Sequence, residues 1–174
     1  MIQKFEFCKT DFDGAFLIKP FCATDVRGAF IKDYSKEVFE ANGLEHNLAE
    51  VFYTVSHKGV IRALHFQRVH VIVDLRPDPP TFKRWQGFYL SEENMNELYV
   101  PEHFAHGYLV LEPSVVSYKC GEKFYGEYDD GIMYNDPDLG VEWPFDEIGG
   151  IENLILADKD KNLQSFREFQ EKYL

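Results

Sequence analysis

The sequence predicts an all-β domain, a sandwich or barrel with short peripheral helices, and three observations support this prediction. Apolar and polar residues alternate with a period of two over short segments, most clearly over 69–76, where valine stands at 69, 71 and 73. Turn residues such as Pro77 to Pro80 and Asn135 to Asp138 separate these segments. Aromatic residues make up 16% of the 174 residues, which suits stacked sheets better than a helical bundle.

Short strands are expected from one end of the chain to the other. They fall at residues 14–19, 60–64, 69–76, 85–90, 98–100, 107–111, 115–120 and 131–134. The alternation over 69–76 indicates a half-buried antiparallel strand. Two helices are expected, one from near Ser35, a suitable N-cap, to Gly43, and a C-terminal one through Ser165 to Lys172. No repeat or linker-like stretch interrupts the chain, so residues 1–174 are expected to form a single domain.

Composition and charge exclude some classes of binding partner and some cellular compartments for this protein. No apolar run approaches the roughly 20 residues that cross a bilayer, and the first residues lack the apolar stretch of a signal peptide, so we expect a cytoplasmic protein that does not bind membranes. A net charge of -12 argues against nucleic acid as a partner, because it would repel a phosphate backbone. Cys8, Cys22 and Cys120 are odd in number and widely spaced, which predicts reduced thiols rather than a disulfide framework or a zinc site.

Six histidines raise two possibilities, a metal site and metal-free acid–base catalysis. A catalytic metal requires at least three ligands and an open position, and the segment Pro101 to His106 could supply part of such a set. The rest of the set is incomplete, because His65 is followed by Phe66 and Gln67. We therefore expect no metal and no other cofactor.

His65 suits acid–base catalysis because an imidazole titrates near neutral pH. It follows the strand-like segment 60–64 and stands three residues after Arg62. An unbroken strand would send Arg62 and His65 to opposite faces, so the two can serve one site only if a β-bulge intervenes. Spacing alone leaves open whether His65 is a hydrogen-bonded core histidine or a catalytic one.

Seven motifs follow one another along the chain. They are Asp25-Val-Arg-Gly-Ala-Phe30, Gly59-Val-Ile-Arg-Ala-Leu-His-Phe-Gln67, Val73-Asp-Leu-Arg76, Leu90-Ser-Glu-Glu-Asn94, Val100-Pro-Glu-His-Phe-Ala-His-Gly-Tyr108, Asp136-Pro-Asp-Leu-Gly-Val-Glu-Trp-Pro144 and Ala157-Asp-Lys-Asp160. Together they resemble the dTDP-4-dehydrorhamnose 3,5-epimerase family over residues 12–168. The resemblance implies a jelly-roll barrel of the cupin type. The segment from Glu50 to Gly59 looks like the branch of that family found in bacterial capsule and surface-polysaccharide gene clusters.

The resemblance implies an isomerase that acts on a nucleotide-linked 4-keto-6-deoxy sugar. The ketone at C4 acidifies the protons on C3 and C5, so a base can remove one, leaving an enolate, and a proton can return from the other face. His65 is implied as the base, and Asp160 as the carboxylate that orients it and stabilises its charge. The acid on the opposite face is a tyrosine in the family. Counting without gaps puts that position at Phe124, and a one-residue shift in the loop gives the role to Tyr125.

The remaining implied residues bind the nucleotide sugar. Arg62 and Arg27 are expected at the diphosphate, where a guanidinium fork suits phosphate oxygens. A neighbouring subunit is expected to supply Arg27, which implies a homodimer with a shared site. His106 is implied in the pocket, and Phe30 and Gln67 are assigned to substrate binding.

The chain departs from the family pattern at further positions. Phe124 at the acid position would leave one centre without a proton donor, so the enzyme would then invert C3 or C5 alone. Ala63 replaces the usual glycine. Gln67 runs directly into Arg68, where the family has a lysine-bearing strand and a glycine turn, so roughly a dozen residues are absent. The intact motifs on both sides favour an omission from the sequence over a true deletion, which would damage the barrel.

Three other functions are compatible with the residues. A 3,4-ketoisomerase or a single-centre epimerase would keep the fold and the base but change the product. A non-catalytic cupin would bind a sugar nucleotide or a partner protein without turnover. A metal-dependent cupin oxygenase or isomerase would need the ligand set that is incomplete here.

Overall fold

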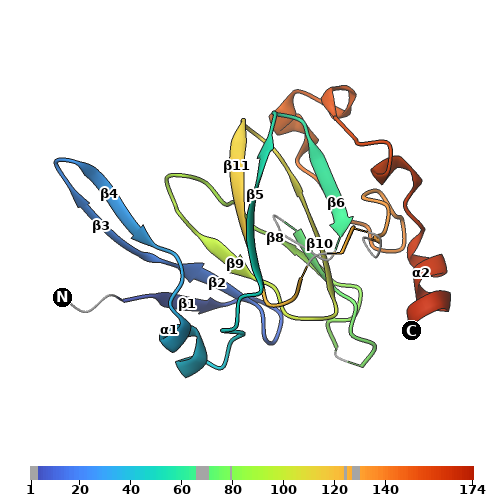
Figure 1. Cartoon of the computed structure of the whole chain (residues 1–174). Coiled ribbons are helices and arrows are strands. Elements are labelled where there is room, and N and C mark those ends of the chain that lie inside the picture. The colour runs from blue at the N-terminus through green and yellow to red at the C-terminus, as the bar shows by residue number, and fades with distance from the viewer. Residues whose placement is uncertain (1–3, 66–70, 79, 124, 127–129) are drawn as a thin grey trace.

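The computed structural model describes residues 4–65, 71–78, 80–123, 125–126 and 130–174, and for His65 it describes the backbone. The described strands are β1 (Glu6–Lys9), β2 (Phe16–Lys19), β3 (Phe21–Asp25), β4 (Gly28–Lys32), β5 (Glu50–Ser56), β6 (Ile61–His65), β7 (Val71–Asp74), β8 (Trp85–Gly87), β9 (Glu97–Tyr99), β10 (Phe104–Leu109) and β11 (Ser114–Cys120). The described α-helices are α1 (Lys36–Ala41) and α2 (Phe166–Tyr173). Short 3-10 helices occupy Phe145–Ile148, Ile151–Asn153 and Asp160–Asn162. The predicted β architecture with peripheral helices, one of them C-terminal, is confirmed (Figure 1).

The strands form four antiparallel groups. These are a sheet in the order β6-β10-β7-β8, a sheet in the order β1-β2-β9, the pair β11-β5 and the hairpin β3-β4. β10 lies inside the four-stranded sheet, and all six of its residues are buried. Figure 1 shows the hairpin β3-β4 projecting from one side of the molecule, with α2 on the opposite side.

β7 is buried on both faces, so the prediction of a half-buried strand was wrong. On one face Val73 packs in the same cluster as Trp143, which comes from the C-terminal part of the chain. On the other face Ile72 packs against Phe12 and Phe104. Phe12, from the N-terminal part of the chain, and Phe104 thus cover the Ile72 side, which the sequence pattern had left to solvent.

The pairing of β6 with β10 contains an irregularity that bears on function. His106 pairs with His65, and Tyr108, two residues later, pairs with Arg62, three residues earlier. One extra residue therefore lies on β6 between the two pairs, which is the definition of a β-bulge. Because of this bulge, Arg62 and position 65 can share one face of the sheet, which an unbroken strand would not allow.

Later parts of the chain run along the free edge of β6. Ile61 donates its backbone N–H to Ile155 O at 3.1 Å, and Leu64 and Ile132 exchange backbone hydrogen bonds of 2.9 and 3.0 Å. Ile132 in turn forms a parallel bridge with Gln164. The segment 155–164 thus begins beside the start of β6 and ends beside the partner of Leu64.

The sequence pattern did not reveal β1, the hairpin β3-β4 or β5. The hairpin is exposed over most of its length, so its residues lack the alternation that burial of one face imposes. β5 carries apolar residues on both faces, since Val51, Tyr53 and Val55 point outward while Phe52 packs inward.

Candidate active site

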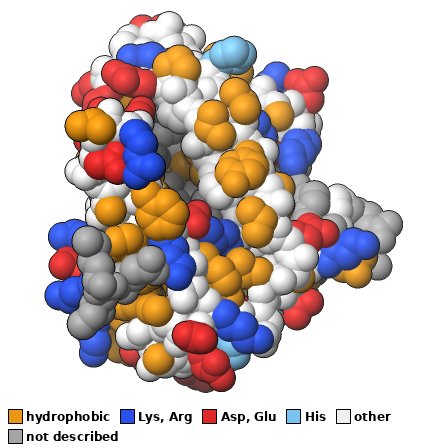
Figure 2. Space-filling model, turned by 60° about the vertical axis from the view of Figure 1, so that its left-hand side comes forward, with side chains coloured by type: hydrophobic (Ala, Val, Ile, Leu, Met, Phe, Trp, Pro, Cys, Tyr) orange, Lys and Arg blue, Asp and Glu red, His pale blue; other side chains and the backbone are white. Residues whose placement is uncertain are grey.

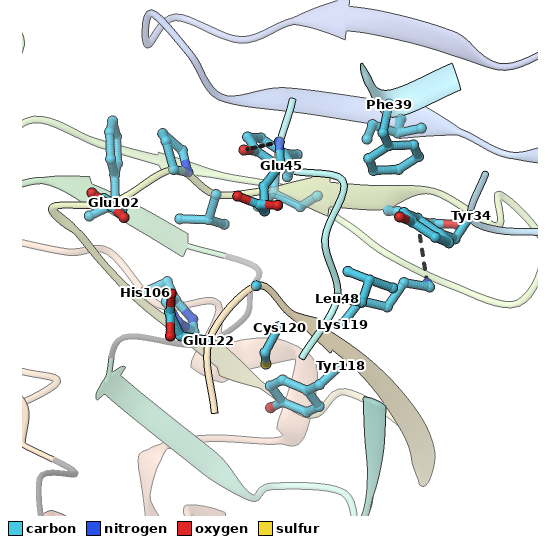
Figure 3. A pocket seen from close by; sticks show the side chains of 18 of the residues that line it. Tyr34, Phe39, Glu45, Leu48, Glu102, His106, Tyr118, Lys119, Cys120 and Glu122 are labelled. Atoms are coloured by element: carbon cyan, nitrogen blue, oxygen red, sulfur yellow. Dashed lines mark hydrogen bonds and ion pairs between the residues drawn. The ribbon is translucent and has the colours of Figure 1, made fainter. Parts of the chain in front are cut away.

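A cavity of about 790 Å³ opens between β9, β10, β11 and the segment that contains α1. Its lining residues are Ile18, Tyr34, Phe39, Glu45, Leu48, Glu97, Leu98, Tyr99, Val100, Pro101, Glu102, His103, Phe104, His106, Tyr118, Lys119, Cys120, Gly121, Glu122 and Lys123. In Figure 3, His106, Cys120 and Glu122 lie toward one side of the cavity, and Leu48, Tyr34 and Phe39 toward the other. A space of this size is typical of small-molecule sites.

His106 and Tyr118 bring polar side chains to the cavity wall. His106 lies on β10 with 1% of its surface exposed, and Tyr118 lies on β11 with 5% exposed. The Tyr118 ring stacks on Phe52, with ring centroids 4.7 Å apart and an interplanar angle of 10°. In Figure 3 the Tyr118 oxygen is turned to the side on which His106 lies. The cavity wall therefore includes a buried imidazole and a buried phenol, and the stack on Phe52 holds the phenol ring.

Charged residues line the other part of the cavity. Lys119 Nζ lies 2.7 Å from an Asp33 carboxylate oxygen and 3.5 Å from one of Glu97, and only 11% of the Lys119 side chain is exposed. Backbone N–H groups of Asn47 and His46 hold the pKa of Glu45 below its ordinary value. Burial, and then the charge of Glu45, raise the pKa of Tyr34, whose hydroxyl donates to His46 O. These contacts fix the loop between α1 and β5 at the cavity wall.

The predicted diphosphate ligands lie in two different places. Arg62 lies on β6, and its Nε and Nη2 both donate to Ser56 Oγ at 3.4 Å. Arg27 lies on the projecting hairpin, with 87% of its side chain exposed, and it forms an ion pair with Asp25 at 2.6 Å. Phe30 is exposed on the same hairpin. Within one chain, Arg27 and Phe30 are not brought to the cavity.

Asp160 is buried, although charged residues stand on both sides of it in the sequence. Its exposed fraction is 3%, and its backbone N–H donates to Ala157 O at 3.0 Å. It stands between Ile155, which pairs beside β6, and Gln164, which bridges to Ile132. The backbone therefore carries Asp160 along the edge of β6.

Tyr125 differs from Tyr118 in its surroundings. It is 53% exposed, Lys123 Nζ lies 5.5 Å from its ring centre, and it does not belong to the cavity lining given above. Phe124, Gln67 and the side chain of His65 lie outside the described residues.

Sequence reasoning missed Tyr118. The strand 115–120 was predicted, and alternation does put Val116, Tyr118 and Cys120 on one face. Nothing in the pattern shows which face turns inward, because Val115 on the other face is also apolar.

The described residues contain neither a metal-binding cluster nor a membrane-spanning helix. No three or more His, Cys, Asp or Glu residues among them come together in a way that could hold a metal ion. No described helix is long and apolar enough to cross a membrane.

Comparison with known proteins identifies the family. The family model for dTDP-4-dehydrorhamnose 3,5-epimerase matches residues 9–168. A dTDP-4-dehydrorhamnose 3,5-epimerase from Methanothermobacter thermautotrophicus is 41% identical over 183 residues, which cover 96% of this chain and 97% of the relative. The chain belongs to the dTDP-4-dehydrorhamnose 3,5-epimerase family. The expected assignment as an isomerase of this family is confirmed.

Solved epimerase structures share the fold. The Bacillus anthracis dTDP-4-dehydrorhamnose 3,5-epimerase, with TDP and PPi bound, superposes with a TM-score of 0.83 at 36% identity, covering 93% of this chain and 99% of that one. The Legionella pneumophila epimerase in complex with dTDP-4-keto-L-rhamnose gives a TM-score of 0.86 at 28% identity, covering 98% and 97%. The expected jelly-roll barrel of the cupin type is confirmed.

The alignment with the Methanothermobacter epimerase is longer than this chain. The alignment has 183 positions and includes 96% of the 174 residues of this chain. The relative therefore contains residues that have no counterpart here. The junction of Gln67 and Arg68 itself lies outside the described residues.

Proposed function

We propose that this epimerase inverts the carbons next to the C4 ketone of a dTDP-4-keto-6-deoxy sugar, converting dTDP-4-dehydro-6-deoxyglucose to dTDP-4-dehydrorhamnose. The observation that carries the proposal is the register of β6 and β10. It pairs position 65 with His106, which lines a cavity that also contains Tyr118. Directly opposed positions of an antiparallel pair belong to one face of a sheet, so the register assigns position 65 to the face of His106.

The base in this proposal is His65, and Asp160 orients its imidazole. The burial of Asp160 supports the pairing, because a buried carboxylate needs a donor or a cation as its partner. The anchoring of segment 155–164 along the edge of β6 supports it as well. A carboxylate in this position fixes the tautomer of the histidine and favours the imidazolium that forms when a proton is removed.

The acid in this proposal is Tyr118 rather than Tyr125. A proton donor must reach the enolate, and a phenol can donate a proton there. Tyr118 is buried at the cavity and is held by its stack on Phe52, whereas Tyr125 is half exposed. With Tyr118 as the acid, Phe124 does not deprive either centre of its proton donor, and inversion at both C3 and C5 is expected.

In this proposal Arg62 of one subunit and Arg27 of a second subunit bind the diphosphate. The exposed hairpin β3-β4 supports this arrangement, because it carries the apolar residues Val26, Phe30 and Ile31 into solvent. Figure 2 shows hydrophobic side chains in a broken row along one face of the molecule. Exposed apolar residues of β5 and β11 are Val51, Tyr53, Val55 and Val115. We infer a homodimer in which the hairpin of each chain covers these residues of the other.

The reaction belongs in a reducing compartment such as the cytoplasm. All three cysteines of the chain are free thiols, and Cys22 is exposed. The substrate brings its own ketone, so proton transfer alone completes the chemistry and the proposal includes no cofactor.

Solvent deuterium tests the proposed function. The enzyme is incubated with dTDP-4-keto-6-deoxyglucose in D₂O, and the product is analysed by NMR. The proposal predicts a deuteron at both C3 and C5 of the inverted sugar. One deuteron would indicate a single-centre epimerase, and a protein that binds the nucleotide sugar without exchange would be the non-catalytic cupin.

A further inference from the structure

We propose that Asp130 is a positioning residue for the epimerisation. Its carboxylate connects the end of α2 to the two segments that lie along β6, residues 130–133 and 155–164. This inference rests on the proposed function. The Asp130 carboxylate collects donors from distant parts of the chain. Oδ2 accepts from Gln164 Nε2 at 2.8 Å, from Tyr173 Oη at 2.8 Å and from Lys172 Nζ at 3.3 Å, and Oδ1 accepts from Gly131 N at 2.8 Å.

The first segment in this network leads directly to the proposed base. Ile132 follows Asp130 by two residues, is 1% exposed, and exchanges both backbone hydrogen bonds with Leu64. Leu64 is the neighbour of His65 in the chain. A shift of residues 130–132 would therefore be transmitted to the end of β6.

The second segment leads to Asp160. Gln164 follows Asp160 by four residues and is bound twice, through its side chain to Asp130 and through its backbone oxygen to Met133 N at 3.0 Å. The Asp130 carboxylate thus connects the two segments that lie along the free edge of β6. The relative position of base and orienting carboxylate depends on this connection.

Helix α2 holds its own donors to Asp130 in a fixed position. A capping box of Ser165 and Glu168 closes its start, where Phe166 N also donates to Asp136 at 2.9 Å. At its end the Tyr173 ring packs on Phe169, with centroids 5.0 Å apart. The helix is held at both ends, and Asp130 is the contact that joins its end to the β6 edge.

The charge of Asp130 matters as well as its shape. Burial alone would raise its pKa, but hydrogen bonds from Tyr173, Gly131, Lys172 and Gln164 outweigh burial and hold the pKa below its ordinary value. An asparagine in its place would turn an NH₂ group toward the same donors. At least one of these contacts would break.

The test uses Asp130→Asn, the milder Tyr173→Phe, which keeps the packed ring, and Asp138→Asn as a matched control. Asp138 pairs with Arg167 on the same helix at 2.8 Å but has no described contact with Gln164 or residues 130–133. Steady-state kinetics are measured where thermal melts show every variant folded. We expect kcat to fall roughly tenfold to a hundredfold in Asp130→Asn with KM nearly unchanged, because small displacements of catalytic groups cost that much. Tyr173→Phe should show a smaller loss of kcat, and Asp138→Asn should stay within about twofold of the parent enzyme.

An unchanged kcat in folded Asp130→Asn overturns the inference, as does an equal loss of kcat in Asp138→Asn. Either result leaves the proposed function intact if the parent enzyme still turns over. A parent enzyme that converts no 4-keto-6-deoxy sugar counts against the proposed function first, and this inference falls with it.

Discussion

Gly107 on β10 lies so close to Ala63 on β6 that a Cβ at position 107 would come within 2.5 Å of the Ala63 Cβ. The Ala63 Cα and the Arg62 carbonyl oxygen would lie 2.8 and 2.9 Å away. This close approach occurs at the bulge that brings Arg62 and position 65 opposite Tyr108 and His106. The glycine therefore makes room for the irregularity on which the site depends.

Gly107→Ala should destabilise the protein by about 1–3 kcal/mol, since backbone atoms cannot move aside as a flexible side chain could. Urea unfolding measures this loss. Ala63→Gly removes the shortest of the three contacts, so the double variant should recover part of the stability. A Gly107→Ala variant as stable as the parent would mean that the two strands are not this close.

Tyr118→Phe should separate proton removal from inversion. Without its acid, the base can still exchange a substrate proton with solvent, but the proton returns from the same face. In D₂O we expect deuterium to enter the substrate while inverted product falls by about 10²–10⁴-fold. Tyr125→Phe should turn over nearly as the parent does. The reverse pattern, a large loss in Tyr125→Phe alone, would give the acid role back to Tyr125.

An all-β sandwich or barrel was predictable from the sequence because burial of one strand face leaves a period of two, and the resemblance of the motifs narrowed this to a jelly-roll barrel. The site was predictable only in part. His106 was expected in the pocket and does line a cavity. The bulge that puts Arg62 and position 65 on one face could not be predicted, because it depends on pairing with a strand some 40 residues away. Tyr118 was missed because both faces of its strand carry valine.

Asp74 is expected to contribute to acid stability. Burial alone would raise its pKa, but hydrogen bonds from Arg76 and Thr81 outweigh burial and lower the pKa. A carboxyl with a lowered folded pKa stabilises the protein at neutral pH and loses that contribution as pH falls from about 4 through the folded value. The carboxylate is fully buried while Arg76 keeps a quarter of its side chain exposed, so Asp74→Asn should cost about 1–3 kcal/mol at pH 7 through its weakened hydrogen bonds. Urea midpoints of parent and variant should converge on acidification, and a gap that widens would refute this account.

The shared site can be tested by mixing two inactive variants. Arg27→Ala removes a hairpin residue, and His65→Asn removes the base. If hairpins exchange between subunits, a mixed dimer holds one site with both defects and one with neither. Co-refolding equal amounts should restore about a quarter of the parent activity, because half the dimers are mixed and each has one intact site. No recovery would mean that each chain completes its own site.

The most direct test of the central claim is deuterium exchange by His65→Asn. The variant should bind TDP within a few fold of the parent Kd by calorimetry, because the diphosphate contacts are untouched. It should incorporate deuterium into dTDP-4-keto-6-deoxyglucose about 10²–10⁴ times more slowly than the parent. Exchange at the parent rate, with TDP binding intact, would show that another group removes the proton.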